Sequence, residues 1–270
     1  MTRKRSGKAC FCTHKIGVNT MIKPSQTTAI LVAAGIGSRM GAQALPKQFL
    51  PVSGVPILAH TLKIFDSAAI VDHIVLVIRA EDRERCERLI ADSGMSKGVS
   101  IVEGGKERQD SVLRGLRAAP PQTDIVLIHD AVRMFVTEEM IHKSINAAWQ
   151  VGASVVAIPA KDTIKEAVAM TNGADEGWPL VSKTYDRRLL WQIQTPQTFQ
   201  YRLILDCYEQ AIAEGFNATD DAMMAEYFGH PVALVAGSYR NIKITTPDDL
   251  LIAEAFLQHQ EGREARNDSL

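Results

Sequence analysis

The sequence predicts one doubly wound α/β domain, and three observations support this prediction. From residue 29 onward, short β-branched runs alternate with amphipathic segments, which is the pattern of a parallel sheet covered by helices. A small-residue turn follows the first of these runs, and such a turn lets a ligand approach the backbone closely. The chain has 270 residues, of which 46% are hydrophobic, and can therefore bury one substantial core.

Six apolar runs have the length and composition of buried strands. They lie at residues 29–34, 73–78, 99–102, 124–128, 154–158 and 232–235. The segments between them predict helices at residues 55–67, 82–93, 108–118, 137–150, 200–214 and 220–228, and a last helix from 247 to about 258. In such Rossmann-like folds ligands bind beyond the carboxyl ends of the strands, so the first and fourth strands should end at one cleft.

The segment 162–182 interrupts this alternation and predicts a protruding β-hairpin. Thr171-Asn172-Gly173 is a turn signal with alternating apolar residues on either side. The segment is too polar to join the core, and a protruding hairpin leaves strand edges that need a cover. We expect an arm at about residues 162–186.

The two ends of the chain differ from the predicted domain at residues 29–258. Residues 1–23 carry several Lys and Arg, no acidic residue and no apolar period. We expect a basic, disordered extension over residues 1–28, with a transit peptide or a start at Met21 as alternatives. Cys10, Cys12 and His14 lack a second pair of ligands, so a metal site there is not favoured. Residues 259–270 are expected to form a polar tail.

The composition argues against several classes of protein. The formal net charge is −1, without the basic surplus of a general nucleic-acid binder. No apolar run approaches the length that crosses a bilayer, which argues against a membrane protein. Cys86 and Cys207 lie in predicted helices outside any disulfide framework, and we expect inert thiols in a reducing cytoplasm.

The turn AAGIGSRM at residues 33–40 predicts a polyphosphate site. Gly35 and Gly37 carry no Cβ that would keep a ligand away from the backbone amides, which can form an anion-binding concavity. Arg39, and Lys47 within the run LPKQFL at 45–50, add two positive charges beside it.

Two familiar phosphate loops do not fit this turn. The Walker pattern requires Gly-Lys followed by Ser or Thr, whereas Lys47 lies between Pro46 and Gln48. The dinucleotide fingerprint needs a small residue where Met40 stands, and an acidic residue at the end of the strand at 73–78, where Arg79 follows. Both departures argue against a nicotinamide-dependent oxidoreductase.

Seven further motifs follow in order along the chain. They are GGKERQDSV at 104–112, HDAVR at 129–133, KDTIK at 161–165, DRRLLW at 186–191, QTPQTF at 194–199, TDD at 219–221 and NIKIT at 241–245. Together with the glycine turn they resemble the motifs of sugar-nucleotide pyrophosphorylase-type nucleotidyltransferases. The closer resemblance is to the 2-C-methyl-D-erythritol 4-phosphate cytidylyltransferase family of the non-mevalonate isoprenoid pathway, and it covers about residues 29–258.

The resemblance implies transfer of a cytidylyl group from CTP to methylerythritol phosphate, with release of pyrophosphate. The catalytic cations that it implies are Arg39, Lys47 and Lys243. The residues that it implies at CTP are Ala33, Ala34, Gly35, Gly37, Gly105, Lys106 and Ser111. The residues that it implies at the polyol phosphate are Asp130, Arg133, Thr163, Arg187 and Thr219. It also implies a homodimer in which the arm donates Thr163 and Arg187 to the neighbouring subunit.

The resemblance and the charge of CTP together imply a Mg²⁺ ion that bridges the CTP phosphates. No side chain is assigned as its direct ligand, although Asp130 is a candidate for substrate hydroxyls or for the metal shell. The attacking phosphate oxygen is already anionic near neutral pH, so the reaction needs positioning and positive charge and no side-chain base.

Several of these residues also have simpler roles. Lys243 can lie on an edge strand with its side chain reaching into solvent, and Asp130 can cap a turn. Asp220 can cap the helix that it begins. His129 and Trp191 are expected to pack in the interior. Met134 stands where the family usually has Pro, and Lys106 where some relatives carry an acidic residue.

Two other functions stay open at this stage. A ribitol 5-phosphate cytidylyltransferase would share the glycine turn and the QTPQ motif, but the motifs at 161–165 and 186–191 favour the methylerythritol family. A non-catalytic nucleotide-binding protein is the alternative of another class. The joint presence of Arg39, Lys47 and Lys243 argues against it.

Overall fold

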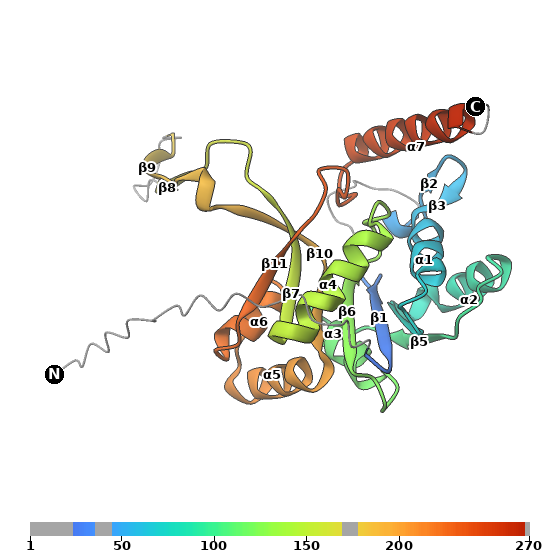
Figure 1. Cartoon of the computed structure of the whole chain (residues 1–270), viewed down its shortest axis with the longest axis horizontal. Coiled ribbons are helices and arrows are strands. Elements are labelled where there is room, and N and C mark those ends of the chain that lie inside the picture. Colours follow the sequence, from blue (N-terminus) through green and yellow to red (C-terminus); the bar gives the residue numbers. More distant parts are fainter. Residues whose placement is uncertain (1–23, 36–44, 169–177, 268–270) are drawn as a thin grey trace.

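A computed structural model of the chain describes residues 24–35, 45–168 and 178–267. Its centre is a seven-stranded sheet in the order β11-β7-β10-β6-β1-β4-β5 (Figure 1). The strands are β1 Thr27–Val32, β4 His73–Ile78, β5 Val99–Glu103, β6 Ile125–Asp130, β7 Ala153–Pro159, β10 Trp191–Gln200 and β11 Val232–Ala236. All neighbours are parallel except β10, which runs antiparallel to β6 and β7.

Helices cover both faces of this sheet, as in a doubly wound fold (Figure 1). They are α1 Ile57–Ser67, α2 Arg83–Asp92, α3 Arg108–Arg117, α4 Glu138–Val151, α5 Tyr201–Glu214, α6 Asp221–Tyr227 and α7 Pro247–Asn267. Successive strand residues point to opposite faces. Leu31 and Leu76 therefore pack with α1, α2 and α4, whereas Ile30 and Val75 pack with α3, α5 and α6.

The six predicted strands are all present, with ends that differ by up to two residues from prediction. The sequence prediction missed β10, because its segment WQIQTPQTFQ is polar and contains Pro196. A proline cannot donate a ladder hydrogen bond and therefore argues against a central strand. In the structure the pairing of β10 with β7 shifts register between Ile193 and Gln197, and Pro196 lies within this irregularity.

The domain begins earlier and ends later than predicted. β1 starts at Thr27, and the backbone N–H of Ser25 already donates to Asp124 Oδ2 at 2.7 Å, so the predicted extension over 1–28 was too long. α7 continues to Asn267, so the predicted tail from residue 259 is largely helical. Residues 1–23 lie outside the described part of the chain.

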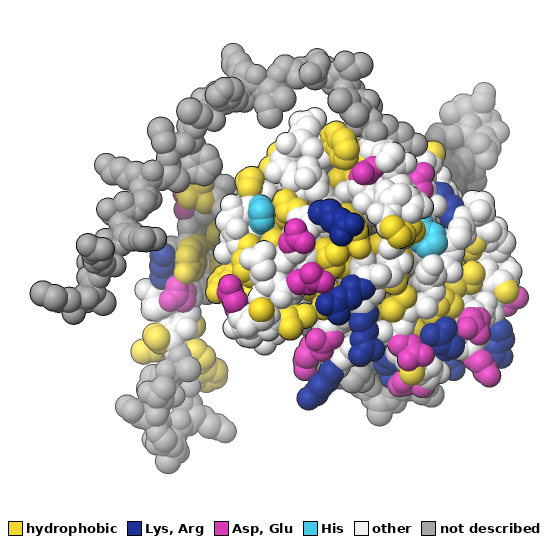
Figure 2. Space-filling model, turned by 90° about the horizontal axis from the view of Figure 1, so that it is seen from below, with side chains coloured by type: hydrophobic (Ala, Val, Ile, Leu, Met, Phe, Trp, Pro, Cys, Tyr) yellow, Lys and Arg dark blue, Asp and Glu magenta, His cyan; other side chains and the backbone are white. Residues whose placement is uncertain are grey.

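The predicted arm is a β-hairpin of β8 (Lys165–Val168) and β9 (Leu180–Thr184), which pair antiparallel. Its predicted turn at residues 171–173 lies outside the described residues. The arm projects from the body and exposes hydrophobic side chains (Figure 2), among them Trp178 at 85% exposure. Trp191, at its base, is 39% exposed, so its expected place in the core is wrong.

The remaining elements are short. They are the hairpin β2 Pro51–Val52 with β3 Val55–Pro56, and the 3-10 turns η2 Lys47–Phe49, η3 Ala80–Asp82 and η4 Arg187–Leu189. Of the helices in the described ranges, none is both long and apolar enough to cross a bilayer.

Candidate active site

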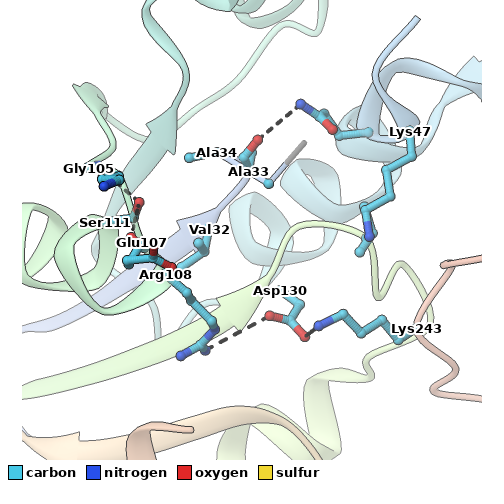
Figure 3. Close-up of a pocket in the computed structure, with 14 residues that line it drawn as sticks. Val32, Ala33, Ala34, Lys47, Gly105, Glu107, Arg108, Ser111, Asp130 and Lys243 are labelled. Atoms are coloured by element: carbon cyan, nitrogen blue, oxygen red, sulfur yellow. Dashed lines mark hydrogen bonds and ion pairs between the residues drawn. The ribbon is translucent and has the colours of Figure 1, made fainter. Parts of the chain in front are cut away.

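A cavity of about 310 Å³ opens at the carboxyl ends of β1 and β6, where the sequence predicts the cleft (Figure 3). Nine predicted site residues line it: Ala33, Ala34, Gly35, Lys47, Gly105, Lys106, Ser111, Asp130 and Lys243. Segments that are far apart in the sequence therefore converge here. Gly37 and Arg39 lie outside the described residues.

One end of the cavity is formed by the loop from β5 into α3. The N-terminus of α3 is closed by a capping box between Glu107 and Asp110. Ser111 Oγ accepts from the backbone N–H of Gly105 at 3.1 Å and donates to the Glu107 carbonyl at 3.0 Å. A Cβ on Gly104 would lie 2.6 Å from the Cβ of Ala34, so only glycine lets this loop approach the end of β1 so closely.

The other end of the cavity carries Lys47 in η2, directly after Pro46. Its neighbour Gln48 is a site residue that the sequence prediction missed. Gln48 is buried and donates from Nε2 to the Ala33 carbonyl at 3.0 Å. This bond ties η2 to the end of β1 and holds Lys47 at the rim of the cavity.

Asp130 lies between the two ends, at the last position of β6. Its Oδ2 pairs with Lys243 Nζ at 2.9 Å and with Arg133 Nε at 3.5 Å, and its Oδ1 lies 4.0 Å from Arg108 Nη2. Burial alone would raise the pKa of the carboxyl, but Lys243, Arg108 and Arg133 hold this pKa well below its usual range. Asp130 is therefore ionised and orients the cations around it.

Arg108 also lines the cavity and was missed as a site residue, together with its partner Asp221. Its guanidinium binds Asp221 through two hydrogen bonds, Nη1 to Oδ1 at 2.8 Å and Nη2 to Oδ2 at 2.6 Å. Asp221 is fully buried, and its charge raises the pKa of Arg108. Both residues belong to motifs noted in the sequence, at 104–112 and 219–221, but nothing there indicates that they pair.

Four predicted polyol-phosphate residues do not line this cavity. Arg133 is mostly buried beneath Asp130 and donates from Nη1 to the Asn241 carbonyl at 2.9 Å. Thr219 contacts Met223 Sδ at 3.4 Å from its Oγ1. Thr163 and Arg187 are exposed near the arm, and Arg187 donates from Nη1 to the Lys161 carbonyl at 2.8 Å.

Two residues near the cavity, Asp220 and His129, have the simpler structural roles that the sequence offered for them. Asp220 accepts from the backbone N–H of Met223 at 2.8 Å and so caps α6. His129 is fully buried, with Nδ1 2.9 Å from Thr195 Oγ1, and burial lowers its pKa to about 4. It is therefore a neutral packing residue at neutral pH.

The described residues of the cavity combine three features that suit a nucleoside polyphosphate. They are small residues after the first parallel strand, lysines at the rim and a central ionised carboxylate. Because the sequence has neither a Walker pattern nor a dinucleotide fingerprint, these features favour the nucleotidyltransferase class.

Comparison with known proteins gives the family. The sequence model of 2-C-methyl-D-erythritol 4-phosphate cytidylyltransferase matches residues 27–259. The chain is 46% identical over 236 residues to the enzyme of that name from Geotalea uraniireducens, covering 86% of this chain and 97% of the relative. It is 45% identical over 241 residues to the one from Alkaliphilus oremlandii, covering 88% of this chain and 98% of the relative.

Solved structures of this family are similar to the chain as well. The crystal structure of 4-diphosphocytidyl-2C-methyl-D-erythritol synthase from Anaerococcus prevotii matches with a TM-score of 0.76 and 36% identity, over 89% of this chain and 99% of that one. A Thermus thermophilus 2-C-methyl-D-erythritol 4-phosphate cytidylyltransferase matches with a TM-score of 0.65 and 31% identity, over 85% and 98% of the two chains. The chain belongs to the 2-C-methyl-D-erythritol 4-phosphate cytidylyltransferase family and is a cytidylyltransferase.

Proposed function

We propose that this cytidylyltransferase transfers the cytidylyl group of CTP to 2-C-methyl-D-erythritol 4-phosphate, giving 4-diphosphocytidyl-2-C-methyl-D-erythritol and pyrophosphate. The observation that carries this proposal is the convergence of Lys47, Lys243 and Asp130 in one cavity with the segment 105–111 at the start of α3. Such a cavity offers cations for phosphates at one end and backbone groups for a base at the other.

The chemistry needs no side-chain base. A phosphate oxygen of the acceptor forms a bond to the α-phosphorus of CTP, and the bond from that phosphorus to the β-phosphate oxygen breaks. Pyrophosphate leaves with the bonding electrons. Negative charge grows on the α-phosphate oxygens, so fixed cations that are oriented in advance lower the barrier most. We assign this role to Lys47, Lys243 and Arg39.

Asp130 supports Lys243 in this role. Its Oδ2 accepts from Lys243 Nζ at 2.9 Å and so directs the ammonium along the cavity wall. An ammonium has three N–H groups, so further donors stay available to a phosphate. We assign Arg133 and Thr219 to the acceptor phosphate and hydroxyls. Neither residue lines the cavity itself.

The cytosine base and the phosphates then occupy the two ends of the cavity. We assign the base to Gly105 and Lys106 in the loop before α3 and to Ser111 in α3, together with Ala33 and Ala34. We assign the phosphates to the turn with Gly35 and Gly37, because glycines leave the backbone amides accessible.

We infer that Mg²⁺ accompanies CTP. The described residues contain no cluster of three or more His, Cys, Asp or Glu that could hold a metal alone. Mg²⁺ in nucleotide sites is bound largely by phosphates and water with one or two carboxylates, and Asp130 is one carboxylate in the cavity. The residues therefore fit an ion that arrives with the nucleotide and neutralises the charge of its phosphates.

We propose that the enzyme is a cytoplasmic homodimer joined through the arm. Trp178 and Leu180 are 85% and 59% exposed, and such apolar side chains on a projecting hairpin favour cover by a second protein surface. A two-fold dimer would bring Thr163 and Arg187 to the neighbouring cavity.

The cysteines support the cytoplasmic part of the proposal. Cys86 and Cys207 are both free and buried, in keeping with a reducing compartment.

The proposal is tested by pyrophosphate release with Mg²⁺ and CTP. We expect release with methylerythritol phosphate and little with ribitol 5-phosphate. Turnover of ribitol 5-phosphate alone would replace the acceptor. Binding of CTP without pyrophosphate release in the presence of either acceptor would make the chain a nucleotide-binding protein without this activity.

A further inference from the structure

A small hydrophobic cluster, separate from the two cores that flank the sheet, connects the segments that carry Lys47, Asp130 and Lys243. Each segment contributes buried side chains that come shortly after its charged residue. Helix α7 packs against the same cluster through Ala253 and Leu250. The buried members are Leu50, Val52, Ile57, Val132, Met134, Ile244 and Ala253. One helix therefore supports the backbone next to all three charged groups.

The N-terminus of α7 holds the residues that follow Lys243. Asp249 Oδ2 accepts from the backbone N–H and the hydroxyl of both Thr245 and Thr246, at 2.8 to 2.9 Å. Burial alone would raise the pKa of Asp249, but these bonds hold this pKa below its ordinary value. Ile244 is fully buried in the cluster, and its backbone N–H donates to the loop after β6 at 3.1 Å. The chain is thus fixed at the three residues that directly follow Lys243.

Further along α7, Glu254 holds the hairpin that follows Lys47. Glu254 Oε1 accepts from the backbone N–H of Ser53 at 2.6 Å, and Oε2 accepts from its hydroxyl at 2.8 Å. Ser53 has a φ of 48°, which is uncommon for residues other than glycine, and the carboxylate stabilises this turn. Figure 1 shows α7 beside the hairpin of β2 and β3, which begins shortly after η2. Glu254 thus connects α7 to the segment of Lys47.

These contacts make the positions of the two lysines depend on one helix. Fixed cations stabilise a transition state only if they are oriented in advance, and a misplacement of about 1 Å can cost about 100-fold in rate. Asp249 and Glu254 are both outside the lining of the cavity, whereas Lys47 and Lys243 belong to it. An effect of either carboxylate on the reaction must therefore act through the segment that it holds.

We propose that Glu254 and Asp249 are positioning residues, Glu254 for Lys47 and Asp249 for Lys243, and that α7 sets the two ammonium groups relative to each other. The inference rests on the proposed function, in which both lysines stabilise charge on the α-phosphate. Glu254 acts through the β2–β3 hairpin and Asp249 through the chain that directly follows its lysine. The helix thereby links two catalytic groups that lie far apart in the sequence.

Single substitutions in the full chain test whether the carboxylates act on the reaction. We expect Glu254→Ala and Asp249→Ala each to lower kcat by about 10-fold or more with little change in KM for CTP, because oriented charge matters most in the transition state. Glu254→Gln should keep most of the activity, since its amide can accept from the Ser53 N–H and donate to the hydroxyl. Asp248→Ala is the matched control. It removes an exposed carboxylate from the first turn of α7 and should keep the wild-type kcat.

Combination with the loss of one lysine separates positioning from general stability. Glu254→Ala should lower kcat in the wild type and in Lys243→Ala, but have little further effect in Lys47→Ala, because the group it positions is gone. Asp249→Ala should show the reverse pattern. Single-turnover assays with enzyme in excess make the slow lysine variants measurable. Circular dichroism would establish that each protein is folded, and Asp249→Asn would replace Asp249→Ala if the latter does not fold.

Two results would overturn the inference and leave the proposed function intact. One is an equal loss in both lysine backgrounds, which would mean that α7 contributes only to stability. The other is wild-type kcat in folded Glu254→Ala and Asp249→Ala. If the unaltered enzyme releases no pyrophosphate from CTP with either acceptor, the proposed function is overturned, and this inference with it.

Discussion

Among single residues, Lys47 carries the most direct part of the proposed chemistry. Loss of one donor that stabilises transition-state charge costs about 3 to 4 kcal/mol, or on the order of a hundred- to thousand-fold in turnover. We therefore predict that Lys47→Ala folds normally but is nearly inactive in pyrophosphate release, and that Arg39→Ala behaves alike. Lys143→Ala, which removes an exposed lysine on α4, is the control and should be fully active. Turnover near that of the control in Lys47→Ala would refute the role.

His129 gives a pH-dependent prediction. Its pKa in the folded protein is about 4, below the ordinary value of 6.5, because the ring is fully buried. Between these values the unfolded chain binds a proton that the folded chain does not, so stability falls as the pH drops from 6.5 towards 4. One such proton contributes about 1.4 kcal/mol per pH unit to this slope.

The measurement is urea unfolding of the wild type and of His129→Asn at several pH values between 4 and 7. We expect the variant to be less stable at pH 7 and to lose less stability on acidification. The same pH slope in both proteins would show that His129 does not change its protonation on unfolding.

Prediction from sequence reached the site residues unevenly. Ala33, Gly105 and Asp130 were implied by the family resemblance of their motifs, and all three line the cavity. The Arg108–Asp221 pair joins residues 113 positions apart, and no periodicity within either segment reveals such a contact. Gln48 was missed for a related reason, since its burial results from the packing of η2 against β1.

At the scale of elements, the parallel strands of the sheet could be predicted from the sequence, whereas β10 could not. The parallel strands could be predicted because burial on both faces demands continuous apolar runs. β10 could not, since its polar residues bind other elements: Gln197 Nε2 donates to Asp220 Oδ2 at 2.9 Å, and Gln194 Nε2 to the Ser238 carbonyl at 2.8 Å. Because its buried side chains bind polar partners, β10 lacks the apolar pattern by which a buried strand is recognised in a sequence.

The arm gives a prediction about subunits. If each arm completes the neighbour's site, Lys47→Ala and Arg187→Ala proteins should both be inactive alone. After co-refolding, about half the dimers are mixed by random pairing, and each mixed dimer has one site with both Lys47 and Arg187 intact. About a quarter of wild-type activity should return on this arithmetic.

Differential tags would establish that mixed dimers form. A mixture of Lys143→Ala and Lys47→Ala proteins is the reference. It forms mixed dimers in the same way, but neither variant changes a residue of the arm, so no activity is regained across it. Mixed dimers of Lys47→Ala and Arg187→Ala that stay inactive would place Arg187 in its own subunit's site or outside any site.

At the scale of the whole molecule, Ser25 and Gln26 connect the start of β1 to Asp124. We predict that deletion of residues 1–20 leaves the melting temperature and the activity unchanged, because the hydrogen bonds from Ser25 to Asp124 and the strand from Thr27 are kept. Deletion of residues 1–26 should lower the melting temperature, since Asp124 loses these partners. A large loss in the shorter deletion would mean that the basic segment docks on the domain.

The arm is an extension of the sheet itself. β7 leads into it and β10 returns from it, and the Ala160 N–H donates to the Leu190 carbonyl at 2.9 Å, beyond the end of β7. Within the sheet, β10 pairs with β6, and Thr195 Oγ1 accepts from the backbone N–H of Asp130 at 3.2 Å. The hairpin is therefore continuous with two strands of the sheet, and one of them, β10, carries the hydroxyl that binds the backbone of Asp130. In the proposed dimer, a force that a second subunit exerts on the arm would reach the backbone of Asp130 along β10.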